Sequence, residues 1–185
     1  MLLLRPMHLI DTHTHLYSEQ FSEDREEMIK RAQAAGVKKL LMPNIDSSSI
    51  EGMKKLVQKF PKVCYPMIGL HPTSVKAGYE EELQLMQKEL KTGGYIAIGE
   101  IGIDLYWSKE FLKEQEAAFR TQIEWAKKHQ LPIVIHCRNA FDEVFEVLES
   151  EKEDDLFGIF HCFTGNYEQA QKALSYNMKL GIGGV

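Results

Sequence analysis

Two histidines that follow a short apolar segment constrain this chain most. Residues 9–15 read LIDTHTH. The apolar start predicts a buried strand, and side chains alternate between the two faces of a strand, so His13 and His15 point the same way. Two imidazoles that converge at a strand end supply half of a metal site. On these residues alone, two unrelated polar side chains in a turn explain the segment equally well.

Apolar segments alternate with helical ones along the whole chain. We expect strands over residues 9–12, 37–42, 63–70, 95–100, 133–136, 156–161 and 178–185. Alternation of strands and helices with short connections predicts parallel βαβ units, and nearly continuous apolar strands are typical of sheets that are buried on both faces. Two α/β architectures fit, an open doubly wound sheet and a closed TIM (β/α)8 barrel. No linker interrupts the pattern, so we expect a single domain over residues 1–185.

Polar residues at the ends of the expected strands favour the barrel. The candidate metal or substrate ligands at these ends are His13, His15, His71, Glu100, His136 and His161. Barrel enzymes keep their chemistry at the carboxyl ends of the strands, and a barrel directs these side chains toward one mouth. An open sheet would spread them along an edge. The loop after the first strand contains no GxGxxG, which counts against a dinucleotide-binding open sheet.

The types of these residues indicate a metal site. Imidazole and carboxylate ligands suit zinc, manganese, iron or nickel, and oxygen-rich sites favour magnesium. The five expected metal ligands are His13, His15, Glu100, His136 and His161. Since a mononuclear catalytic zinc usually has three protein ligands, we predict two divalent metal ions (Mg, Mn or Zn) that Glu100 bridges. Two metals about 3.5–4 Å apart can generate a hydroxide and hold an in-line displacement at phosphorus.

Several other polar and aromatic residues follow the same strands. Arg138 lies two residues after His136, and its guanidinium suits a phosphate; a surface arginine near a helix start explains it equally well. Asp104 could orient a ligand histidine or a substrate group, or it could cap the turn that leads to Tyr106. Tyr106 and Trp107 could stack on a base, or they could be ordinary exposed aromatics of a loop.

Composition limits the partners and the location that we expect. The net charge of −5 argues against a broad surface that coats nucleic acid, but it permits a small phosphate site. No apolar run approaches the ~20 residues that span a bilayer, and the first seven residues lack the order of a signal peptide. The three cysteines form no CxxC pair. We therefore expect a cytoplasmic protein with free thiols, no membrane partner and a monomeric state.

Five motifs in a fixed order carry a family resemblance. They read IDTHTHL (10–16), GLHP (69–72), GEIGID (99–104), PIVIHCR (132–138) and FHCFTG (160–165). Together they resemble the TatD family of metal-dependent deoxyribonucleases, which belongs to the amidohydrolase-like barrels. The resemblance covers essentially the whole chain. It implies a (β/α)8 barrel and a divalent-metal hydrolase that cleaves phosphodiester bonds in DNA, often as a 3′-to-5′ exonuclease.

The resemblance also implies roles for individual residues. Carried over motif by motif, the metal ligands are His13 and His15 for one metal, Glu100 as the bridge, and His136 and His161 for the second metal. By the same resemblance, His71 and Arg138 contact the scissile phosphate.

The pattern of the family extends beyond the sequence given. The family also uses an aspartate at the end of the eighth strand, whereas this sequence ends at Val185, inside the expected seventh strand. A closed barrel typically has about 250 residues. We therefore expect about seven of the eight strands in the given chain, without that aspartate, and we assign the function to the complete protein.

Two other functions stay open on the sequence alone. A metal-bound hydroxide also attacks carbonyl centres, so the chain could be a hydrolase of small amides, esters or lactones, which the negative net charge mildly favours. Against it, related amidohydrolases often bridge their metals with a carboxylated lysine at the end of the fourth strand, where this chain has Glu100. The third function is a metal-dependent binding protein without catalysis, which the loss of a ligand would support.

Overall fold

The computed structural model describes residues 8–184, in which parallel strands alternate with helices. The strands are β1 (Leu9–Asp11), β2 (Val37–Met42), β3 (Cys64–Pro66), β4 (Ile98–Asp104), β5 (Ile133–Arg138), β6 (Gly158–Phe160) and β7 (Met178–Leu180). The α-helices are α1 (Arg25–Ala34), α2 (Ser47–Lys59), α3 (Tyr79–Leu90), α4 (Leu112–His129), α5 (Phe141–Glu151) and α6 (Tyr167–Ser175). Two 3₁₀ turns, η1 (Glu19–Phe21) and η2 (Pro72–Ser74), complete the described elements.

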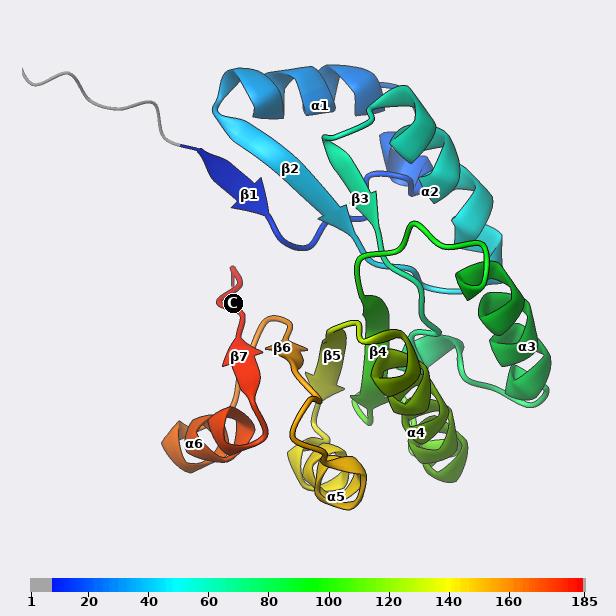
Figure 1. Cartoon of the computed structure of the whole chain (residues 1–185), viewed down its shortest axis with the longest axis vertical. Coiled ribbons are helices and arrows are strands. Elements are labelled where there is room, and N and C mark those ends of the chain that lie inside the picture. Colours follow the sequence, from blue (N-terminus) through cyan, green and yellow to red (C-terminus); the bar gives the residue numbers. More distant parts are fainter. Residues whose placement is uncertain (1–7, 185) are drawn as a thin grey trace, which may run out of the picture.

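The strands lie side by side in the order of the chain. β1, β2 and β3 form one parallel sheet, β4 to β7 form another, and a bridge between Ile68 and Ile98 links the two. Helices cover the outer side of this curved arrangement, and β1 and β7 are its two end strands (Figure 1). A doubly wound sheet would reverse its strand order at a switch point. The predicted TIM-barrel type of fold is therefore confirmed, with seven strands in residues 8–184.

β1 and β7 form the two open ends of the described strand order. Within residues 8–184, β1 and β7 are not paired with each other. The single domain over residues 1–185 and the eighth strand beyond the sequence given stay predictions. Val185, the predicted end of the seventh strand, lies outside the described residues.

Burial differs strongly along the sheet. All seven residues of β4 are buried, and Ile98, Ile101 and Ile103 are fully inaccessible to solvent. All three residues of β1 are exposed. A fully buried strand is what a parallel sheet covered by helices requires, so β4 forms the centre of the core and β1 its edge.

The bounds of β4 correct the sequence prediction. We predicted a strand over 95–100, but β4 begins at Ile98 and continues to Asp104. Glu100 therefore lies inside the strand and not at its end. The predicted end was wrong because glycine is unfavourable inside a strand, so that Gly102 argues for an end before it. In the structure, Gly102 instead allows the backbone of β5 to approach β4 closely. Its φ is +135°, and a Cβ at this position would lie 2.1 Å from the carbonyl oxygen of His136 on β5.

Two further sequence predictions concern the membrane and the thiols. No helix within residues 8–184 is both long and apolar enough to cross a membrane. The three cysteines of the chain, Cys64, Cys137 and Cys162, are free thiols, as predicted.

Candidate metal centre

Four histidines surround the buried carboxylate of Glu100. The Nε2 atoms of His13 and His15 lie 3.1 and 3.8 Å from its Oε2. The Nδ1 of His136 lies 3.0 Å, and the Nε2 of His71 lies 3.8 Å, from its Oε1. The two carboxylate oxygens thus face two different pairs of imidazoles. One carboxylate therefore belongs to two groups of converging ligand atoms, one with His13 and His15 and one with His71 and His136.

The charge of Glu100 is buried among histidine side chains. Its side chain is 3% exposed, and its ion pairs within residues 8–184 are with histidines alone. Burial raises the pKa of Glu100, but hydrogen bonds from His13 and His136 outweigh burial and hold the pKa well below its ordinary value. A buried carboxylate among imidazoles needs a cation for charge balance, so the residues present fit a bound divalent metal.

His13 and His15 form the first group of possible ligands. Their Nε2 atoms lie 3.2 Å apart, and one ligand atom from each, with one from Glu100, lie within 4.8 Å of one another. The hydroxyl of Tyr17 donates to the carbonyl oxygen of Pro43 at 2.6 Å and lies 2.8 Å from His15 Nδ1. Since its only proton is used on Pro43, this hydroxyl accepts a hydrogen bond from Nδ1–H of His15. The Nε2 of His15 is then unprotonated and can bind a metal.

Asp104 connects His136 to the loop after β4. Its Oδ2 lies 2.8 Å from His136 Nε2, and its Oδ1 accepts a hydrogen bond from the backbone N–H of Tyr106 at 3.0 Å. Both contacts that the sequence offered as alternatives for Asp104 are therefore present together. Burial lowers the pKa of His136, but its hydrogen bonds to Glu100 and Asp104 outweigh burial and raise it. Asp104 thereby holds His136 with its Nδ1 toward Glu100.

His71 differs from the other histidines in the nitrogen that it presents. It caps η2, and its Nδ1 accepts a hydrogen bond from the backbone N–H of Thr73 at 3.2 Å. Burial lowers the pKa of His71 to about 4, so the ring is neutral near pH 7 and its proton is on Nε2. His71, Glu100 and His136 satisfy the distance criterion for a metal group. A protonated Nε2 donates a hydrogen bond and does not bind a metal, which favours a substrate contact for His71.

The two remaining candidates lie around this centre. The ring of His161 stacks on that of His13, with their centroids 3.3 Å apart, and among the described residues it belongs to neither group of converging ligand atoms. The guanidinium of Arg138 lies over the ring of Tyr106 at 3.7 Å and 5.6 Å from the ring of Trp107. The rings of Tyr106 and Trp107 therefore hold the guanidinium of Arg138 in place by cation–π contacts, which are typical of arginine.

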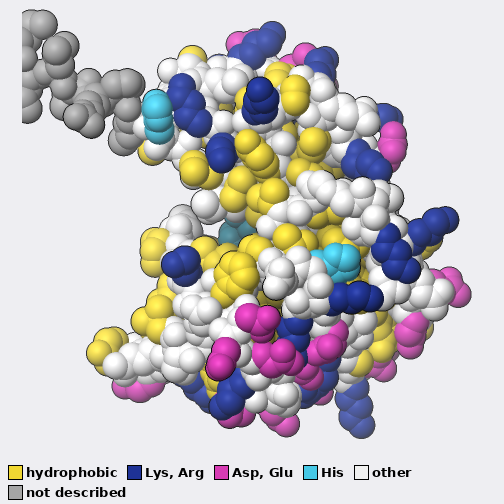
Figure 2. Space-filling view, in the orientation of Figure 1, with side chains coloured by type: hydrophobic (Ala, Val, Ile, Leu, Met, Phe, Trp, Pro, Cys, Tyr) yellow, Lys and Arg dark blue, Asp and Glu magenta, His cyan; other side chains and the backbone are white. Residues whose placement is uncertain are grey.

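Space for a substrate is present next to these residues. Figure 2 shows the molecule hollowed between its β1–β3 part and its β4–β7 part, with a histidine side chain at the bottom of the hollow and hydrophobic side chains around it. A pocket of about 560 Å³ is lined by His136, His161, Arg138 and Tyr106 among others. A second pocket, of about 320 Å³, contains His13 and His161. His161 thus borders both pockets.

Sequence reasoning missed two residues that set proton positions in this centre. Tyr17 lies in the turn after His15, outside β1, which ends at Asp11, so no strand periodicity could have identified it. Thr73 follows the His-Pro pair, which is a common start of a helical turn. Neither residue is itself a metal ligand, which is why a search for ligand types passed over them.

Comparisons with known proteins extend this description. A family model for TatD-related DNases matches residues 10–185. The chain belongs to the TatD-related DNase family. It is therefore a metal-dependent hydrolase of the class that acts on ester bonds, and its His and Glu residues are positioned for metal binding.

Individual relatives agree with this assignment. The chain is 36% identical over 176 residues to an uncharacterized metal-dependent hydrolase, YabD, of Bacillus subtilis, covering 95% of this chain and 69% of the relative. It is 31% identical over 176 residues to the 3′-5′ ssDNA/RNA exonuclease TatD of a Pantoea species, covering 95% and 68%. The crystal structure of YjjV, a TatD homologue from Escherichia coli, superposes with a TM-score of 0.87 at 29% identity, covering 95% and 68%.

Proposed function

We propose that this protein hydrolyses phosphodiester bonds in DNA as a 3′-to-5′ exonuclease that depends on two divalent metal ions. The observation that carries the proposal is the position of Glu100, whose two oxygens face separate groups of imidazoles. One relative at 31% identity is named as an exonuclease of single-stranded DNA and RNA, which supports nucleic acid as the substrate.

The proposed metal ligands follow the two sides of Glu100. His13 and His15 on the Oε2 side hold the first metal, His136 on the Oε1 side holds the second, and Glu100 bridges them. His161, whose ring stacks on His13, is assigned to the second metal on the resemblance of its FHCFTG motif to the family. When bound, the metals supply an acidified water and stabilise negative charge at phosphorus. Their identity among Mg, Mn and Zn is left open by the donor set, because nitrogen and carboxylate ligands serve several divalent ions.

The remaining site residues act on the substrate or on the ligands. His71 offers its protonated Nε2 to a phosphate oxygen from a position 3.8 Å from Glu100. Arg138 presents two parallel N–H donors that match a phosphate. Asp104 accepts from Nε2 of His136 and so orients that ring. Together these residues place a phosphodiester against the face of the metal centre.

A second candidate function is hydrolysis of a small amide, ester or lactone on the same centre. The net charge of −5 favours it over a substrate with a long polyanionic backbone. The same ligands serve both reactions, since a metal-bound water attacks carbonyl and phosphoryl centres alike. The two candidate functions differ only in the substrate that the residues around the metal centre bind.

The test is release of the terminal nucleotide from a 3′-labelled single-stranded DNA oligomer with magnesium or manganese. We expect a labelled mononucleotide as the first product, progressive shortening of the same oligomer when it carries the label at its 5′ end, and loss of both with EDTA or in Glu100→Gln. The matched control is Glu81→Gln, because Glu81 is an exposed residue of α3. Intact DNA, together with metal-dependent hydrolysis of an ester or lactone panel, would replace the first candidate by the second. Release from the 5′ end first would overturn the polarity.

A further inference from the structure

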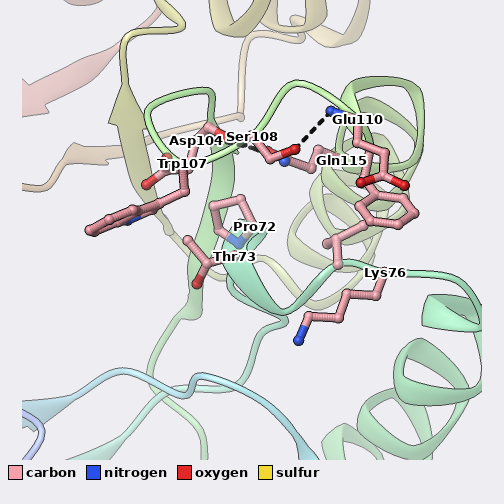
Figure 3. Close-up of a pocket in the computed structure, with 10 residues that line it drawn as sticks. Pro72, Thr73, Lys76, Asp104, Trp107, Ser108, Glu110 and Gln115 are labelled. Carbon is pink, nitrogen blue, oxygen red and sulfur yellow. Dashed lines mark hydrogen bonds between the residues drawn. The ribbon is translucent and has the colours of Figure 1, made fainter.

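A pocket that the proposed metal ligands do not form lies next to the metal centre. It has a volume of about 420 Å³ and lies between η2 and the segment that joins β4 to α4. Figure 3 shows Pro72 and Thr73 between Trp107 on one side and Glu110 on the other, with the amine of Lys76 below them. Asp104 also lines this pocket.

Two lining residues connect the pocket directly to the histidines of the centre. Asp104 lines the pocket and contacts His136 Nε2 at 2.8 Å. Thr73 lines it too, and its hydroxyl lies 2.7 Å from His71 Nδ1. His71 and His136 both face the Oε1 of Glu100. Asp104 and Thr73 thus each contact a histidine on the Oε1 side of Glu100 and also line the pocket, which makes the pocket the neighbour of that side.

The lining suits a planar aromatic ring with polar edges. Trp107 is 73% exposed, so packing in the core does not explain its position. It meets the ring of Tyr106 edge-on, with centroids 4.8 Å apart at 89°, and this contact holds the indole at the pocket. Pro72 provides an apolar surface, while Lys76 provides a hydrogen-bond donor.

We infer that this pocket binds the nucleobase of the nucleotide whose phosphate lies at Glu100, an inference that rests on the proposed function. Its volume is near the lower end of the roughly 300–1,000 Å³ that ligand pockets have, which suits one nucleoside. Lys76 and Glu110 are exposed, long side chains, and the amide of Gln115 is already bonded to the backbone of Asp104, so none of the three imposes a fixed pattern of donors and acceptors on a base. Stacking on Trp107 is then tolerant of base identity, so all four terminal nucleotides fit.

Tryptophan fluorescence tests the inference without any catalytic step. The chain has two tryptophans, and Trp125 is only 5% exposed. Titration with thymidine 5′-monophosphate is expected to quench the emission of Trp107 saturably, while deoxyribose 5-phosphate, which lacks a base, leaves it unchanged. Trp107→Phe should abolish the quenching, and Trp125→Phe should preserve it. Equal quenching by the two phosphates, or quenching that survives in Trp107→Phe, overturns the inference.

Kinetics with a modified substrate separate base binding from the chemistry. Trp107→Ala should slow release of an ordinary 3′-terminal nucleotide by about tenfold or more, as expected for a lost stacking contact. Release of a terminal tetrahydrofuran nucleotide, which has no base, should stay within about twofold in the same variant. Equal slowing of both substrates overturns the inference.

The two proposals fail separately. If thymidine monophosphate quenches the parent protein saturably but not Trp107→Phe, and the protein leaves DNA intact, the base pocket is kept and the exonuclease is rejected. DNA shortening without base-dependent quenching keeps the exonuclease and rejects the pocket.

Discussion

The two sides of Glu100 are held in place by different kinds of structure. His136 lies inside β5, which pairs with β4 on one side and β6 on the other. His13 and His15 follow β1, an exposed end strand that pairs with β2 alone among the described strands. A histidine on an inner strand is positioned by the hydrogen bonds of the sheet itself. A histidine after an end strand needs other anchors.

Side chains provide these anchors on the β1 side. Arg25, the first residue of α1, donates hydrogen bonds to the carbonyl oxygens of Leu16, Tyr17 and Ser18 at 2.5, 3.0 and 2.7 Å. It therefore holds the turn that follows His15 against the helix. Tyr17 adds its hydrogen bonds to Pro43 and His15. The difference teaches that one half of the centre depends on the backbone ladder and the other on a few polar side chains.

The largest expected effect is a loss of stability when the close packing of β4 against β5 is disturbed. Gly102→Ala should lower the free energy of unfolding by about 3 kcal/mol or more, because it adds both a strained positive φ and an overlap with the carbonyl of His136. Gly78→Ala is the matched control, since Gly78 also has a positive φ but has open space around it. Its expected loss is only about 1–2 kcal/mol. Equal losses in urea unfolding would show that the close approach of β5 is unimportant.

The next effect concerns the anchor of the β1 side. Arg25→Ala should lower the free energy of unfolding by about 2 kcal/mol, because it leaves three carbonyl oxygens without a charged donor. Arg31→Ala should lower it by less than about 1 kcal/mol, since Arg31 forms an exposed ion pair with Asp24. Urea unfolding compares the two variants. If both lose the same small amount, the turn after His15 is held by something other than Arg25.

Asp104→Asn tests the orientation of His136 on the inner side. The weaker amide acceptor should reduce affinity for the second metal by about 10–100-fold, the usual effect of changing a residue that orients a metal ligand. Affinity for the first metal should not change. Calorimetric titration with manganese resolves the two sites, and a change in both would indicate that Asp104 acts on the whole centre.

Tyr17→Phe is the corresponding change on the β1 side, with the smallest expected effect. It removes the acceptor for Nδ1–H of His15, so the proton can move to Nε2 and compete with the metal. Affinity for the first metal should fall toward the lower end of the range of about 10–100-fold, with the second site unaffected. The same titration checks it, and unchanged affinity at both sites would reject the role given to Tyr17.

The local periods of the sequence predicted much of the fold. The alternation of strands and helices, and hence the parallel sheet, could be predicted because the spacing of apolar residues differs between the two and is visible in short segments. The extension of β4 beyond Glu100 could not be predicted, since Gly102 is unfavourable in a strand by itself and is required only by the backbone of His136 on β5. That requirement belongs to packing between strands and leaves no local signal.

The candidate site divides in the same way. The convergence of His13 and His15 was predicted from their spacing of two, but β1 ends at Asp11, so both rings reach Glu100 from the irregular segment after the strand. The nitrogen that each ring presents depends on partners such as Tyr17 and Thr73, so it required the structure. The stacking of His161 on His13 likewise depends on how β6 lies against the segment after β1.

The most direct test of the bridging role of Glu100 is the number of metal ions bound per chain. Calorimetric titration of the protein with manganese should give two equivalents. Glu100→Gln should lose measurable binding at both sites, while its far-UV circular dichroism stays that of the parent protein. A single equivalent in the parent protein, or two equivalents of unchanged affinity in Glu100→Gln, would contradict a centre built on one shared carboxylate.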